Sequence, residues 1–356
     1  MFLHRVMCGT RLLIPVQTCR NFSQLHRSSK IFQKNVSSPH TRIKTSFRFQ
    51  SNQAEDRIKE ELAQEFRQSM KLSHLVRPLV FTVGVSSASI VGATIWEYEY
   101  VRSQVSKMMN SSTKFFQNRQ KNISDLKGAW NRFTDGQLKE AWERLSPGDQ
   151  FFIPIFGLNM LVFTLWRIPR LQTMLLRNFC ANPAGPAPCR SMLLSTFSHY
   201  SFFHIFANMY VLNSFSNGVC MALGKEQTLA MYLSAGVVAS FASYMHKVST
   251  GISGASLGAS GAILGILGYV CTRYPDTQLQ IMFLPMFQFS ADSAIKVIMA
   301  VDIIGCVMGW KFFDHAAHLG GALFGVFWCF IGEQYIWPHR KHITEKWHQF
   351  RTATCS

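Results

Sequence analysis

The sequence predicts an all-α polytopic membrane protein, with a six-helix core preceded by one extra transmembrane helix (1+6). Two observations lead to this fold class. Of the 356 residues, 48% are hydrophobic and only 15% are charged, whereas about a quarter of residues are charged in soluble proteins. The apolar residues are also gathered into blocks, and not spread at the periodicity of a soluble core. A membrane protein is therefore favoured over two or three soluble domains.

Seven of these blocks approach the roughly 17–25 residues that one helix needs to cross the hydrocarbon layer. They are 79–97, 150–168, 202–222, 228–246, 256–272, 293–310 and 316–336. The first stands alone, and six follow a polar interval. The segment 256–272 is short and rich in glycine, so a strict hydropathy window would miss it.

The net charge of +17 arises unevenly along the chain. Residues 1–54 contain nine Lys or Arg and no acidic residue, with many Ser, Thr and Gln between them. This composition is typical of a mitochondrial presequence. An alternative interpretation is a basic tail that binds anionic lipid or nucleic acid. Neither a lysine-rich block nor a base-stacking aromatic pattern accompanies the charge, so no nucleic-acid partner is expected.

The remaining chain divides by composition into five further segments. We expect a polar linker at 55–77, the extra transmembrane helix at 78–97, a polar connector at 98–149, the six-helix core at 150–337 and a basic C-terminal tail at 338–356. The sequence contains no internal repeat and no nucleotide-binding loop.

The nine cysteines show neither a CxxC motif nor zinc-ligand spacing, so the sequence predicts no metal and no cofactor. Cys180 and Cys189 flank a proline-rich stretch in the loop 167–201. They would pair only if that loop faced an oxidising space.

Ser260 lies in a segment of small residues, with Gly258 two residues before it and Gly261 one after it. Thin helices of this kind pack closely against their neighbours in lipid. Taken alone, the segment is better interpreted as a packing helix whose serine bonds a carbonyl one turn earlier. Ser253 and Ser256 are competing serines, but neither has glycines at these two positions.

His318 favours a catalytic interpretation. An ionisable side chain in a membrane segment is costly, so it usually faces a protein interior or a water-filled cavity. Gly321 and Gly325 lie three and seven residues later, on the same helix face. This bare face would let the His318 helix approach the Ser260 helix, and a serine bonded to a neutral imidazole is the minimum arrangement for a nucleophile. His315, one turn earlier, is expected nearer water at the helix mouth.

A third polar pair lies at the start of the span 202–222. His204 and Asn208 are four residues apart and so project from one helix face. Two donors that point the same way would suit an oxyanion, a term worth roughly 3–4 kcal/mol per donor in soluble proteases. The alternative is polar contact between helices, without a catalytic role.

Taken together, these motifs resemble those of the rhomboid family of intramembrane serine proteases. The resemblance covers about 150–337 and rests on three motifs in the family's order: His204-x-x-x-Asn208, Gly258-x-Ser260-Gly261 and Ala317-His318-x-x-Gly321-x-x-x-Gly325. The extra N-terminal helix and the presequence point to its mitochondrial branch, the presenilin-associated rhomboid-like proteases.

The resemblance implies a role for each polar residue of the three motifs. Ser260 and His318 would form a catalytic dyad, and His204, Asn208 and the Ser260 amide would form the oxyanion site. Many rhomboids place a tyrosine one turn after the serine, to pack on the histidine, but this chain has Leu264. The orientation of His318 is thus left to other residues. Asp302, inside the span 293–310, is a candidate orienting carboxylate, although a structural hydrogen-bonded aspartate is the competing interpretation.

The resemblance also implies partners and a location. Substrates would be single-span proteins in the lipid bilayer of the mitochondrial inner membrane, in which the chain would be a multi-pass protein. In this branch they include a dynamin-like fusion GTPase and a kinase of mitochondrial quality control, with consequences for membrane dynamics, mitophagy and apoptosis. No residue of the chain identifies those substrates.

Two other classes of function compete with a protease. A catalytically inactive rhomboid-like protein would bind transmembrane helices without cutting them, but such relatives typically lose the serine, the histidine or the surrounding glycines. A solute carrier would show internal repeats and paired broken helices, which this sequence lacks.

Overall fold

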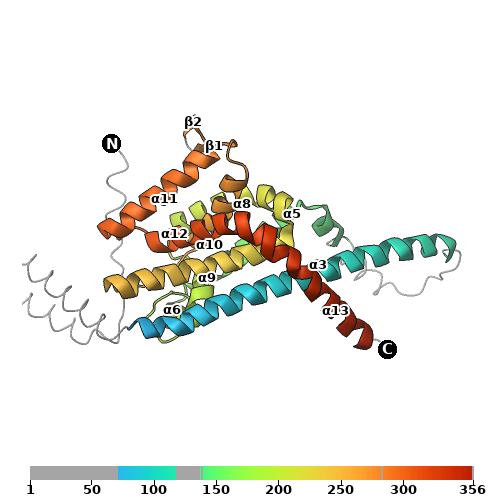
Figure 1. Cartoon of the computed structure of the whole chain (residues 1–356), viewed down its shortest axis with the longest axis horizontal. Coiled ribbons are helices and arrows are strands. Elements are labelled where there is room, and N and C mark those ends of the chain that lie inside the picture. Colours follow the sequence, from blue (N-terminus) through green and yellow to red (C-terminus); the bar gives the residue numbers. More distant parts are fainter. Residues whose placement is uncertain (1–70, 118–136, 138, 282–283, 355–356) are drawn as a thin grey trace, which may run out of the picture. The chain divides into compact units, whose positions relative to one another are not determined.

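Almost all regular structure in the described part of the chain is helical, as its apolar blocks predict (Figure 1). The computed structural model describes residues 71–117, 137, 139–281 and 284–354. The predicted presequence, 1–54, lies outside these residues, as does most of the linker 55–77. The fold class, an all-α polytopic membrane protein, is confirmed.

The longer helices are α3 (Val76–Gln117), α5 (Pro147–Leu165), α8 (Phe202–Leu223), α9 (Lys225–Thr250), α10 (Ser260–Arg273), α11 (Ala291–Met308), α12 (His315–Phe327) and α13 (Arg340–Thr354). Those from α5 to α12 follow the predicted spans closely, whereas α13 lies in the predicted basic tail, where no span is expected. A π-helical segment, η3 (Trp328–Ile336), continues α12, so the two together cover the predicted span 316–336. The first predicted span, 79–97, is only part of α3, which runs on into the polar connector.

Several helix ends are set by residues suited to them. At the start of α5, the Ser146 hydroxyl accepts a hydrogen bond from the Asp149 amide, and Pro147 is the first helical residue. Gly251 ends α9 and Gly309 ends α11, each with a positive φ that disfavours other residues. Asp314 caps the start of α12.

Shorter elements occupy two of the connections. The loop 167–201 contains α6 (Pro169–Asn178), α7 (Pro188–Leu194) and the 3₁₀ turn η2 (Ser195–Phe197). Two antiparallel strands, β1 (Gln278–Ile281) and β2 (Leu284–Ser290), form a hairpin between α10 and α11. The sequence predicts no strand there. Further 3₁₀ turns precede α3 (η1, Leu72–Leu75) and α13 (η4, Trp337–His339).

Helix α10 lies at the centre of the core. Residues 261–271 are all buried, and α8, α9, α11 and α12 pack around them. Helix α9 packs against α10 and α12 and also lies along α3 (Figure 1). Helix α13 crosses α3, where Arg340 and Arg351 pair with Glu97 and Glu99, each at 2.9 Å.

The outward faces of several helices are apolar. On α11 the exposed large side chains include Val297, Val301, Ile304 and Val307. A row of apolar side chains suits contact with lipid, because the hydrocarbon layer offers no hydrogen-bonding partners. By length and composition, four helical segments of the described chain can cross a membrane: Leu72–Met109, Pro147–Leu165, Lys225–Thr250 and His315–Thr354. The count of seven spans stays a prediction.

Helix α10 starts later than predicted. Residues 256–259 are not helical, and the helix begins at Ser260. Gly258 has φ +134°, which lies outside the helical range and which side chains disfavour. The remaining 14 residues span about 21 Å, less than the roughly 30 Å of the hydrocarbon layer. Because neighbouring helices surround α10, it contacts protein and not lipid, and it does not have to match the thickness of that layer.

Candidate active site

Ser260 is the first residue of α10, and its side chain points toward α12. The backbone amides of a first helical turn have no partner within the helix and carry the positive end of its dipole. Ala259, in the capping position, offers no side-chain bond. The serine hydroxyl therefore lies next to amide groups that can stabilise negative charge.

His318 contacts Ser260 directly. The distance between His318 Nε2 and Ser260 Oγ is 2.8 Å, a normal hydrogen-bond length. The His318 side chain is 17% exposed, so the pair is largely shielded by protein. The structure thus brings together the serine and the histidine that the sequence singles out.

The glycines on both helices allow this approach. A Cβ on Gly321 would overlap the Gly261 carbonyl, and a Cβ on Gly325 would overlap the Gly265 carbonyl. Any side chain at these positions would push the two backbones apart. The close approach expected from the bare helix face is present.

Asp302 lies on the far side of His318 from the serine, but its nearest partner is His315. Asp302 Oδ1 is 2.7 Å from His315 Nδ1 and 3.5 Å from His318 Nδ1. The longer distance exceeds a hydrogen bond. The prediction that His315 lies near water is wrong: it is buried, 6% exposed. The ring fits because Gly305 on α11 leaves space that a Cβ would fill.

An aromatic ring lies beside His318. The Phe313 ring centroid is 5.8 Å from that of His318, with the planes tilted by 32°. Phe313 comes from the loop before α12, whereas Leu264 occupies the position one turn after the serine. Ring packing on the histidine is therefore supplied from the histidine's own side of the site.

His204 lies against the loop that leads to Ser260. A Cβ on Gly258 would be 2.7 Å from His204 Cε1 and 2.9 Å from its Nε2, so only glycine leaves room for this ring. Asn208 is on the same helix, but its Nδ2 donates to the His204 carbonyl at 2.8 Å. The Asn208 amide has a second N–H that this bond does not use.

The sequence predicts no role for His199, yet this side chain also supports the loop. Its Nε2 accepts a hydrogen bond from the Ala259 amide at 3.3 Å, and its ring stands edge-on to that of His204, with centroids 4.8 Å apart. Burial lowers the pKa of His199 to about 3, so the ring is neutral and can accept. Its position in a histidine-rich run, ahead of the apolar span, is the only signal in the sequence.

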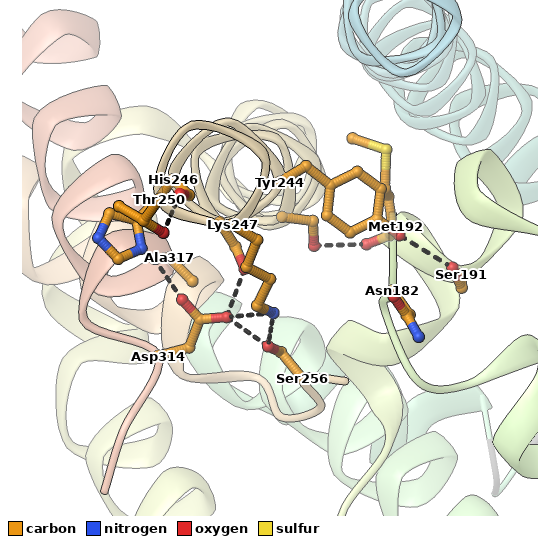
Figure 2. A network of polar contacts seen from close by, with 12 residues as sticks. Asn182, Ser191, Met192, Tyr244, His246, Lys247, Thr250, Ser256, Asp314 and Ala317 are labelled. Carbon is orange, nitrogen blue, oxygen red and sulfur yellow. Dashed lines mark hydrogen bonds and ion pairs between the residues drawn. The ribbon is translucent and has the colours of Figure 1, made fainter. Parts of the chain in front are cut away.

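A second unpredicted cluster surrounds Asp314 (Figure 2). Its carboxylate accepts hydrogen bonds from Ser243 and Ser256 and pairs with Lys247 at 3.1 Å. Burial opposes ionisation of Asp314, but Lys247 and the hydroxyl donors outweigh it and lower the pKa to about 2. The hydroxyl of Ser256, one of the two alternative candidate nucleophiles in the sequence, is thus hydrogen-bonded within this cluster.

Among the described residues, no group of three or more His, Cys, Asp or Glu could hold a metal ion. Cys180 and Cys189 are both free thiols, so the disulfide considered for the loop 167–201 is not formed.

The fold and this site together define a class: a polytopic helical membrane protein whose buried core joins a serine to a histidine. Residues 188–335 match the family model described as "Rhomboid domain". The human "Presenilin-associated rhomboid-like protein, mitochondrial" is 46% identical over 278 residues, 78% of this chain and 72% of the relative.

Two more distant relatives agree. The zebrafish "Presenilin-associated rhomboid-like protein A, mitochondrial" is 42% identical over 297 residues, 79% of this chain and 76% of the relative. The yeast "Rhomboid protein 1, mitochondrial" is 32% identical over 174 residues, 48% of this chain and 50% of the relative. The chain belongs to the rhomboid family, in its mitochondrial, presenilin-associated rhomboid-like branch.

Proposed function

We propose that the protein is an intramembrane serine endopeptidase in which Ser260 is the nucleophile and His318 the general base. The observation that carries this proposal is the 2.8 Å hydrogen bond between His318 Nε2 and Ser260 Oγ. As Ser260 attacks a peptide carbonyl, its proton passes to Nε2. The protonated His318 then gives that proton to the leaving amine. In the second half of the reaction, His318 takes a proton from water as the water attacks the acyl group, and returns it to the Ser260 oxygen as the acyl bond breaks.

The negative charge on the carbonyl oxygen needs donors that are already in place. The Ser260 amide is one, at the free end of α10. His204, beside Gly258, and Asn208, through its unused N–H, are the others that we propose. Asn208 now donates to its own helix, so substrate binding would turn or share that amide group.

Asp302 completes the proposed arrangement as an orienting carboxylate. For Nε2 of a neutral His318 to accept the serine proton, Nδ1 must carry the ring's own proton. That Nδ1 faces Asp302 Oδ1 at 3.5 Å, so the carboxylate favours this tautomer and stabilises the imidazolium that follows. Since His315 holds the same oxygen at 2.7 Å, Asp302 acts on His318 from a fixed position, without a full hydrogen bond.

The substrates that fit this site are membrane-spanning segments. A helical peptide bond is shielded by its own hydrogen bonds, so a substrate helix must unwind before Ser260 can attack. We propose single-span proteins of the mitochondrial inner membrane, including by family resemblance a dynamin-like GTPase and a quality-control kinase. The basic, acid-free segment 1–54 and relatives named as mitochondrial support this location. The implied roles are in membrane dynamics, mitophagy and apoptosis.

A fluorophosphonate probe, which reacts with activated serines, tests this proposal. We expect the full-length protein in detergent or vesicles to be labelled at Ser260, because His318 removes the proton from that hydroxyl alone. Peptide mass spectrometry identifies the modified serine, and His318→Ala is expected to lose the label. Labelling at Ser253 or Ser256, or none in folded protein, would contradict the assignment and favour an inactive helix-binding protein.

The role of Asp302 is tested by Asp302→Asn, which keeps the shape but removes the charge. We expect kcat to fall about tenfold with little change in KM, because a carboxylate beyond hydrogen-bond distance orients His318 weakly. His315→Ala, which removes the closest partner of Asp302, is the comparison and is expected to keep substantial activity. An Asp302→Asn enzyme with wild-type kcat would show that the carboxylate serves only α11 and His315.

A further inference from the structure

Asp314 holds the start of the histidine helix with both its side chain and its backbone. Its Oδ1 accepts a hydrogen bond from the Ala317 amide at 3.1 Å, and its carbonyl accepts one from the His318 amide at 3.0 Å. The Ala317 amide would otherwise lack a partner, and the bond from the His318 amide is the first intrahelical bond of α12. The position of His318 on α12 therefore depends on where Asp314 is held.

The other carboxylate oxygen of Asp314 faces the serine loop and α9. Oδ2 accepts a hydrogen bond from the Ser256 hydroxyl and pairs with Lys247 Nζ at 3.1 Å (Figure 2). The Ser243 hydroxyl donates to the same oxygen. Lys247 also donates to Ser256. Because a serine hydroxyl has one proton, the lysine bond leaves that proton directed at Asp314. One carboxylate thus joins three parts of the chain.

Ser256 belongs to the loop that carries the proposed nucleophile. Its backbone pairs with that of Ala181, through bonds of 2.7 and 2.9 Å between amides and carbonyls, and the Gly258 amide bonds the Ser195 carbonyl at 3.0 Å. These contacts fix the loop to the connection 167–201. The Ser256 side chain is the link from the loop across to α12.

The Ser256–Asp314 bond stands in register with the proposed dyad. Ser256 lies four residues before Ser260, and Asp314 lies four residues before His318, so both bonds join residues 58 apart. On the other side of the dyad, Gly321 contacts Gly261. The serine and histidine are consequently flanked by one polar contact and one glycine contact between the same two segments.

We propose that Asp314, through Ser256, is a positioning residue that sets the serine loop against the histidine helix. The inference rests on the proposed protease function. Asp314 is not a catalytic residue, because its side chain contacts neither Ser260 nor the ring of His318. Its charge matters, since one oxygen that receives two hydroxyls and an ammonium group must be anionic. From α9, the ion pair with Lys247 holds Asp314 in place and Ser243 adds one further hydrogen bond to the same oxygen. Ser256 transmits the position of Asp314 to the loop.

Two serine variants separate positioning from ordinary stability. Ser256→Ala and Ser243→Ala each remove one hydroxyl from the same oxygen of Asp314, but only Ser256 lies in the serine loop. We expect Ser256→Ala to lower kcat about tenfold, with KM within about twofold, because small misplacements of reacting groups are costly. Ser243→Ala is expected to keep kcat within about twofold, although the two variants lose similar thermal stability.

Two quantities are measured for the full-length protein in vesicles. One is kcat for cleavage of a reporter transmembrane segment, and the other is the rate of labelling by a fluorophosphonate probe. Ser256→Thr returns the hydroxyl and is expected to recover kcat and the labelling rate. If Ser256→Ala does not fold, Ser256→Cys provides a side chain of the same shape, slightly larger and with a much weaker donor, and is expected to show the same fall in kcat.

Two results would overturn the inference. One is a folded Ser256→Ala or Ser256→Cys enzyme with wild-type kcat and labelling rate. The other is an equal loss of kcat in Ser243→Ala, which would reveal a general effect of stability. Failure of the protease function is recognised separately. In that case either the folded wild type leaves the reporter uncut, or Ser260→Ala cleaves it as well as the wild type does, and the positioning role would fall with it.

Discussion

Cleavage of a reporter transmembrane segment is expected to be lost when Ser260 is replaced by alanine. The substitution removes the proposed nucleophile and the 2.8 Å bond to His318. Among the described residues, no other serine is hydrogen-bonded to that histidine. In soluble serine proteases, loss of the nucleophile lowers kcat on the order of 10⁶-fold. We expect a fall of at least about 10⁴-fold, which the assay would record as no product.

The matched control is Ser253→Ala. Ser253 lies in the same loop but is exposed, so its removal is expected to leave kcat within about twofold, as is usual away from special features. Melting temperatures of both variants in detergent show whether each is folded. Cleavage that persists in folded Ser260→Ala would refute the dyad.

The second large effect is expected from Gly321→Ala. The added methyl would overlap the carbonyl of Gly261, and the neighbouring atoms are backbone, so no side chain can rotate away. Overpacking of this kind usually costs about 1–3 kcal/mol, and sometimes more. Because the methyl separates α10 from α12 one turn below the dyad, we expect kcat to fall at least about 100-fold, along with the melting temperature.

Gly218→Ala on α8 provides the comparison. A Cβ there has no neighbour within 4 Å, and alanine is favoured over glycine inside a helix by about 0.5–1 kcal/mol. Its melting temperature is expected to be unchanged or slightly higher, with normal cleavage. A Gly321→Ala protein as stable and active as Gly218→Ala would mean that the helices can part without consequence.

The sequence predicts the helices well because each apolar block is long and its ends carry suitable residues. The predicted span 202–222, for example, is α8 almost without change. Helix α10 is the exception, since glycine runs are compatible with both helix and loop. Gly258 has a positive φ, and a Cβ there would collide with the His204 ring, which belongs to another helix. That boundary therefore depends on tertiary contacts.

The polar residues divide in the same way. The closeness of Ser260 and His318 can be predicted from spacing, because glycines on one helix face indicate that another helix packs closely there. The partners of Asp314 cannot, since they lie on α9 and on a loop whose path is not periodic. The same limit explains His315: its spacing from His318 says that they share a face, but only the packing of α11 shows that this face is buried at that level.

The contacts between α10 and α12 also fix the direction of the two helices. Residue pairs 256/314, 260/318, 261/321 and 265/325 rise together along both segments, so the two helices run parallel. Parallel neighbours cannot be joined by a short turn; the chain must first travel back the full length of the pair. Helix α11 provides that return path, and Asp302 lies on it. The Asp302 carboxylate lies near His318 because the connection between two parallel helices requires a third helix, running in the opposite direction, beside them.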